Sequence, residues 1–282
     1  MLTSPGPVPY IERQINQRRA VADKPPLPFL LSDIQPHLGA WMDASSRSAN
    51  LSFIPQPVDA ADPPVAAVSA TSTFGGKHAA REHTAHTISG TGLHGAPVDP
   101  DEFVPPSRVF RTYCLAFHHL PHNAAARVLR STLATADGFA ILELQERRLS
   151  SLLLMLADGP VVCLAALAWC WRDVGMLALC LVVPLVPVVC VWDGIVSCLR
   201  TREFEEVVGL LEDGEAEREG LVGRIEKVVD EEGTAVKRVE VDGWRLEGGR
   251  VRHTWPLGWA NYVIGVKMIS LSGESGSNVG GG

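Results

Sequence analysis

One long apolar zone constrains this chain more than any other feature of its sequence. Residues 161–171 are apolar throughout, Arg172 and Asp173 interrupt the run, and residues 174–192 carry no charge. The second run is close to the roughly 20 residues that a helix needs to cross a bilayer. Its two prolines would kink such a helix, which membrane helices tolerate better than soluble ones. The zone therefore predicts an apolar helical hairpin inserted into the rest of the fold.

The charges that flank this zone bear on where the hairpin lies. Arg147 and Arg148 precede it, and Arg200 and Arg202 follow it. Positive charge at both outer ends favours a hairpin whose two ends stay on the cytoplasmic side, with membrane contact through 161–192. The alternative is a soluble protein in which the hairpin forms a buried cap over a site. We expect a location on the cytoplasmic side of a membrane, or in the cytoplasm.

Composition excludes several classes of partner. The formal net charge of the 282 residues is −7, and no basic run contains interleaved aromatic residues, so a nucleic-acid partner is not expected. The six cysteines form no CxxC pair and lie mostly in apolar runs, which indicates buried thiols in a reducing environment. The spacings of the histidines between 78 and 94 match no tight ligand set, so no metal site is expected.

Composition also divides the chain into segments. Residues 61–107 are rich in Ala, Pro, Ser, Thr, Gly and His and show no apolar periodicity, which is typical of disorder. Around them we expect ordered regions, a hairpin and a polar tail. The segments are an ordered region 1–60, a disordered insertion 61–107, an ordered region 108–148, the apolar hairpin 149–202, a C-terminal helix with edge strands 203–269, and a disordered tail 270–282.

Local patterns predict the elements inside the ordered segments. Expected helices cover 10–22, 123–135 and 203–211, with Thr201 as a candidate cap for the third. The expected strands are 29–31, 51–55, 109–117, 139–143, a piece around Trp244, and 261–267.

The segment from Tyr113 to Glu143 is the most informative part of the sequence. A strand ends in Phe117-His118-His119-Leu120, a helix follows, and a second strand begins at Gly138 and ends at Glu143. This order is that of a βαβ crossover. It resembles the fourth and fifth strands of class I S-adenosylmethionine-dependent methyltransferases, where a His-His-Phe-type loop follows strand four. The resemblance is to a poorly characterised fungal and bacterial group of that family.

The resemblance implies an α/β fold with a Rossmann-like methyltransferase sheet, of which 1–60 and 108–148 form two parts. The family begins with a strand and a glycine-rich turn, and that strand lies between strands two and four. Here only residues around Gly6 correspond to the end of that turn, and an expected helix follows at once. We therefore expect a sheet that is incomplete at its first strand, as in an N-terminally truncated form. The two last strands would be an antiparallel edge pair.

The same resemblance implies roles for particular residues. Asp33, after the second strand, would hold the ribose hydroxyls of S-adenosylmethionine, and Asp59, after the third, would accept from the adenine amino group. Gly6 and the loop after strand four would also contact the cofactor. That loop supplies Ala116, Phe117 and His118, and His119 is the candidate general base for an acceptor that must lose a proton.

The expected function is therefore that of a methyltransferase-like protein. The apolar hairpin beside the site makes a lipophilic small-molecule acceptor the working hypothesis. Two alternatives stay open at this point. One is a catalytically inactive, membrane-associated interaction protein that keeps the fold, and the other is a plain small membrane protein whose resemblance is accidental.

Overall fold

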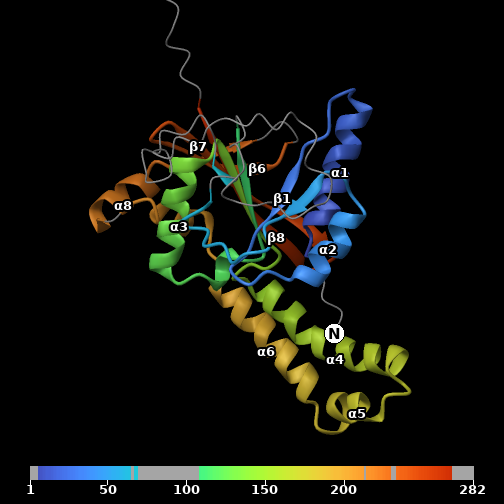
Figure 1. Ribbon diagram of the computed structural model, residues 1–282. Helices are drawn as coiled ribbons and strands as arrows, with labels where there is room; N and C mark the ends of the chain where they lie inside the picture. Colours follow the sequence, from blue (N-terminus) through green and yellow to red (C-terminus); the bar gives the residue numbers. More distant parts are fainter. Residues whose placement is uncertain (1–5, 65–66, 69–107, 213, 230–232, 269–282) are drawn as a thin grey trace, which may run out of the picture.

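The computed structural model describes residues 6–64, 67–68, 108–212, 214–229 and 233–268. They form an α/β fold with a mixed six-stranded sheet, a separate pair of parallel strands, and a helical hairpin that projects from the rest (Figure 1). The predicted tail 270–282 and most of the predicted insertion 61–107 lie outside the described residues.

The N-terminal region builds a small unit around the parallel pair. It contains α1 (Val8–Val21), β1 (Phe29–Leu31), α2 (Leu38–Ser46) and β2 (Leu51–Phe53). β1 and β2 pair in register from Phe29 opposite Leu51. The sequence predicted β1 correctly and placed α1 within two residues, but it missed α2, a short helix whose serines favour caps and turns. The unit has its own core, formed by Leu31, Trp41, Ala44, Leu51 and Phe53.

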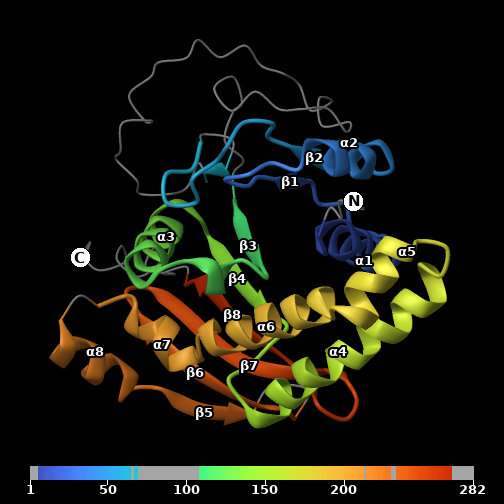
Figure 2. The same ribbon diagram turned by 90° about the horizontal axis from the view of Figure 1, so that it is seen from below.

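The six-stranded sheet is built from the rest of the chain. Its order is β3-β4-β8-β7-β6-β5, with β3 and β4 parallel and every other pair antiparallel. Figure 2 shows this order across the sheet. The strands are β3 (Phe110–Cys114), β4 (Gly138–Glu143), β5 (Glu226–Val229), β6 (Ala235–Val241), β7 (Trp244–Thr254) and β8 (Gly258–Lys267).

One prediction about this sheet was wrong. The strands around Trp244 and Val263 do pair antiparallel, but they do not form its edge: β8 lies between β4 and β7, and β5 and β6 extend the sheet beyond them. The sequence did not predict β5 and β6, because lysines, arginines and glutamates occupy about half of their positions. Charged residues of this kind obscure the apolar alternation of a half-buried strand.

Three helices cover one face of the sheet. α3 (His122–Thr135), α7 (Phe204–Gly209) and α8 (Glu215–Val222) pack there through apolar side chains such as Leu129, Val208 and Leu221. The sequence placed α3 within one residue. It was wrong about the cap of α7: Glu203 and Glu206 form a capping box, and the Thr201 hydroxyl donates to the Ser197 carbonyl instead.

The hairpin consists of α4 (Leu149–Trp169), α5 (Val174–Leu177), the π-helical turn η3 (Ala178–Val182) and α6 (Leu185–Arg200). α4 and α6 approach closely at two glycines, Gly159 near Val191 and Gly194 near Met155. Among the described residues, α4 is the one helix that is both long enough and apolar enough to cross a membrane. The segments α5–η3 and α6 would together give a second span, bent by 60°. Many large apolar side chains of the hairpin are exposed, and Trp169 is 82% exposed.

The separation of the two sheets bears on the predicted gap at the first strand. Among the described residues, β1 pairs with β2 alone and β3 pairs with β4 alone. The loop after β2 joins the two parts, because Ala60 and Ala61 pack against the core of the larger sheet. Arg111 adds a second link by donating to the Ala67 carbonyl at 3.0 Å. Part of the segment predicted as an insertion from residue 61 is thus packed against the fold.

Candidate functional site

Apart from Gly6, the predicted site residues follow the carboxyl ends of strands in two parallel pairs, β1–β2 and β3–β4. Asp33 follows β1, Asp59 follows β2, and the short 3-10 helix η2 (Phe117–His119) follows β3. Glu143 is the last residue of β4. Because parallel strands end at the same edge, Asp33 and Asp59 belong to one edge, and η2 and Glu143 belong to another.

Asp33 and Asp59 lie in neighbouring exposed loops. The Val58 N–H donates to the Asp33 carbonyl at 2.9 Å, which holds the two loops together. Each carboxylate also accepts a backbone N–H two residues ahead, Asp33 from Gln35 at 2.8 Å and Asp59 from Ala61 at 2.9 Å. These local turns fix both aspartates while the side chains stay open to solvent. The arrangement offers carboxylate acceptors for hydroxyl or amino groups.

A buried hydrogen-bonded contact joins the ends of β3 and β4. Glu143 accepts the His118 backbone N–H at 3.0 Å with one carboxylate oxygen, and its other oxygen lies 2.7 Å from His118 Nδ1. Both side chains are buried. A carboxylate on Nδ1 fixes the orientation of an imidazole ring and leaves Nε2 as its other polar atom. Glu143 had no predicted role, although an acid at the end of a buried strand indicates a candidate site residue.

His119, the predicted general base, lies beside this pair. Its side chain is exposed, and its ring centroid is 4.1 Å from that of His118. The structure therefore brings the predicted base and the predicted cofactor residue His118 together. His118, oriented by Glu143, has the arrangement more usual for a positioned base, whereas His119 is the more accessible of the two.

Cys114, at the end of β3, lies near the same carboxylate. Burial, with the negative charge of Glu143, raises the pKa of the Cys114 thiol to about 11. At neutral pH this group is a neutral thiol, and a thiolate nucleophile is not available there.

Phe117 and Ala116 differ in what they can contribute. The Phe117 side chain is 2% exposed and belongs to the main core, so its ring does not face a ligand. Ala116 is exposed and immediately precedes η2. Gly6 is exposed just before α1, with a φ of +73° that glycine adopts easily. α1 itself packs through Val8 on the core of the β1–β2 unit.

The base of the apolar hairpin is bonded to this turn. Arg202, two residues beyond α6, donates to the Phe117 carbonyl at 2.9 Å and to the Leu120 carbonyl at 2.6 Å. Its guanidinium also lies 5.6 Å from the centre of the Phe117 ring. Burial lowers the pKa of Arg202, an effect that Glu206 opposes. In the sequence Arg202 is visible only as a charge that flanks the apolar zone, and nothing in its spacing indicates these contacts.

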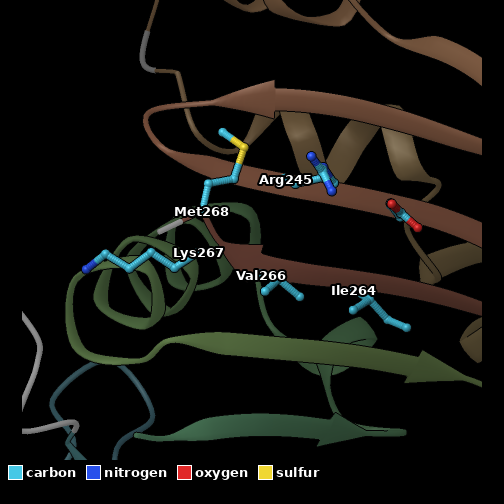
Figure 3. Close-up of a pocket in the computed structure, with 6 residues that line it drawn as sticks. Arg245, Ile264, Val266, Lys267 and Met268 are labelled. Atoms are coloured by element: carbon cyan, nitrogen blue, oxygen red, sulfur yellow. The ribbon is translucent and has the colours of Figure 1, made fainter. Parts of the chain in front are cut away.

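A separate depression lies on the sheet face that α3, α7 and α8 do not cover. Trp244 and Leu246 point into the core, so the alternating Arg245 and Glu247 point to the opposite face. Figure 3 shows Arg245 on β7 beside Ile264 and Val266 on β8. The depression is wide and open, and none of the predicted site residues lines it. Within the described ranges, no group of three or more His, Cys, Asp or Glu side chains could hold a metal ion.

Comparison with known proteins gave no match to a family model, a curated protein or a solved structure. The structure by itself defines the class as a mixed α/β protein with an exposed apolar helical hairpin. The chemistry of the strand-end site is what remains to be assigned.

Proposed function

We propose that this chain is an S-adenosylmethionine-dependent methyltransferase-like protein that works at a membrane surface on a lipophilic acceptor. The observation that carries the proposal is the bond between hairpin and site. Arg202 holds the turn that contains His118 and His119 to the base of the apolar helices. An acceptor dissolved in the membrane would therefore meet the site where the hairpin leaves the lipid.

The strand order supports the methyltransferase part of the proposal. The structure has one parallel pair, β1 with β2, and a second parallel pair, β3 with β4, which antiparallel strands extend beyond β4. If one further strand stood between β1 and β3, the strand order would be the one that the resemblance implies. The acids after β1 and β2 are the residues that, by this resemblance, would hold the nucleoside. A Rossmann-like sheet is thus part of the proposal.

The donor set fits part of the cofactor. The exposed carboxylates of Asp33 and Asp59 suit the ribose hydroxyls and the adenine amino group. The described residues do not supply a glycine-rich turn for the rest of the molecule. When bound, S-adenosylmethionine supplies an electrophilic methyl group.

The chain's own residues would then position the acceptor and remove its proton. Positioning and exclusion of water account for much of such a transfer. His118 is held by Glu143, and its ring lies 4.1 Å from that of His119, so two imidazoles are available for the proton of a hydroxyl or amine. No metal enters this scheme.

The membrane part of the proposal follows from the exposed hairpin. A 21-residue helix such as α4 is about 31 Å long, close to the thickness of a hydrocarbon core. Leaving its leucines and tryptophans in water would be unfavourable by about 25 cal/mol for each Å² of apolar surface. A bilayer removes that surface from water and places Arg147, Arg148 and Arg200 at the cytoplasmic side.

Calorimetric titration of the full chain in neutral detergent with S-adenosylmethionine tests the proposal. We expect binding that weakens at least tenfold in Asp33→Ala, because the ribose contact is lost. Asp43→Ala is the matched control, since Asp43 pairs with Arg47 on the surface of α2 and should leave binding unchanged. Absence of binding to the unaltered chain would reject the proposal.

A second candidate is a membrane-associated interaction protein without catalysis. It is favoured by the Phe117 ring, which points into the core, and by the depression on the far face, which none of the site residues lines. This reading predicts membrane association without S-adenosylmethionine binding.

A further inference from the structure

The turn between β7 and β8 lies against the segment that leads into the apolar hairpin. His253 Nε2 is 3.1 Å from the Leu144 carbonyl oxygen, and an Arg250 guanidinium nitrogen is 3.8 Å from Glu146. Figure 2 shows this turn beside the first turns of α4. Residues far apart in the chain therefore meet at the base of the hairpin.

Two arginines flank a single buried carboxylate at this position, and a third lies on the same tryptophan ring as one of them. Glu146 is buried and lies 3.4 Å from Arg148 as well as 3.8 Å from Arg250. Arg250 and Arg252 both lie on the Trp259 ring, with guanidinium carbons 4.8 and 4.7 Å from its centre. One glutamate cannot neutralise three arginines, so the cluster is locally positive in a chain with a net charge of −7. Stacking on tryptophan orders the guanidinium groups while leaving N–H donors at their edges.

Two exposed apolar side chains adjoin the arginines along the chain. Trp255, at the tip of the turn, is 80% exposed, and Leu149, next to Arg148, is 72% exposed. Leu149 is the first residue of α4, so this apolar surface is continuous with that of the hairpin. Tryptophan beside arginine is the composition typical of the interface between lipid and water.

We propose that the β7–β8 turn and the start of α4 form a headgroup site that binds the phosphate of anionic phospholipids. We name it by its residues, Arg148, Arg250, Arg252 and Trp255. The inference rests on the membrane location proposed above, but it requires neither S-adenosylmethionine nor methyl transfer. A guanidinium pairs with phosphate through two parallel hydrogen bonds, and Trp255 would enter the interface beside it. The occupant is a lipid because the cluster lies where the hairpin leaves the membrane.

Vesicle flotation of the full chain tests the site. The chain is synthesised without cells in the presence of limiting vesicles, made either of phosphatidylcholine or of phosphatidylcholine with phosphatidylglycerol. We expect the anionic vesicles to recover more protein, and the excess to fall as salt is raised. Each arginine at an anionic surface is worth about fivefold in partitioning, so Arg250→Gln with Arg252→Gln should lower the anionic preference by about tenfold or more. Arg245→Gln, on the same strand but on the open sheet face, is the matched control.

The outcomes separate this inference from the proposed function. Equal flotation with both kinds of vesicle would overturn the headgroup site and leave the membrane location standing. Flotation with neither would overturn both. Binding of inorganic phosphate to the chain in neutral detergent, together with equal flotation on both kinds of vesicle, would show a phosphate site instead of a lipid site. Retention of the preference in the double variant would also overturn the assignment to these arginines.

Discussion

At the scale of single residues, the contact between Glu143 and His118 ties the end of β4 to the turn after β3. Each group satisfies the other in a place that water does not reach, and Glu143 accepts two hydrogen bonds. Buried polar groups are stable only when they are paired in this way. The pair therefore supports the turn whether or not His118 takes part in chemistry.

Glu143→Ala should lower the free energy of unfolding by about 2–4 kcal/mol, because it leaves the His118 N–H and ring buried without their acceptor. The measurement is chemical denaturation of the full chain in neutral detergent. Glu240→Ala removes an exposed partner of Arg245 and should change that free energy by less than about 0.5 kcal/mol. Similar effects for the two variants would contradict the assigned pairing.

At the scale of elements, the fit between neighbouring strands depends on small residues. A Cβ atom added at Gly265 in β8 would collide with the Phe139 ring from β4, and Phe139 is fully buried. The ring cannot move without opening the core. This close contact fixes how tightly β8 lies against β4.

Gly265→Ala should therefore destabilise the fold by about 1–3 kcal/mol through overpacking. Gly39→Ala is the control, since a Cβ there meets nothing within 4 Å and alanine favours the helix α2. It should leave stability unchanged or raise it by up to about 1 kcal/mol. Thermal unfolding monitored by circular dichroism compares the two variants. If Gly265→Ala raised the unfolding temperature, the close packing of Gly265 against the Phe139 ring would be contradicted.

The elements also show what could be predicted from the sequence. Local apolar patterns within single segments were enough to predict β1, α1, α3, β4 and the hairpin. The interior position of β8 could not be predicted in this way, because strand order depends on pairing between distant segments. For the candidate site, the positions of Asp33, Asp59 and His118 after strands could be predicted from the sequence, and the roles that the resemblance implies for them stay predictions. The pairing of His118 with Glu143 and the bonds of Arg202 to the turn depend on side-chain directions that no local pattern gives.

At the scale of the whole molecule, the hairpin decides where the protein can reside. Leu164 and Val189 are 65% and 56% exposed on α4 and α6. In water, charges at such positions would be tolerated. In the hydrocarbon core each lysine is unfavourable by about 3 kcal/mol.

Leu164→Lys with Val189→Lys should therefore reduce the membrane-bound fraction of the chain by at least tenfold in a flotation assay. Leu27→Lys, which changes an exposed leucine of the N-terminal unit, should not alter it. An unchanged fraction in the double variant would mean that these helices do not enter lipid.

The place of β8 in the sheet has a consequence for how the molecule is made. β4 leaves the ribosome before the hairpin, whereas β8, which pairs with it, follows both the hairpin and β5 to β7. If the apolar helices enter a membrane as proposed above, they can do so while one side of β4 still lacks its neighbour. Chains halted between Arg200 and Gly258 would hold a complete apolar hairpin and an unfinished sheet, a state exposed to aggregation and proteolysis. The lifetime of that intermediate, set by translation speed, would then govern the yield of folded protein.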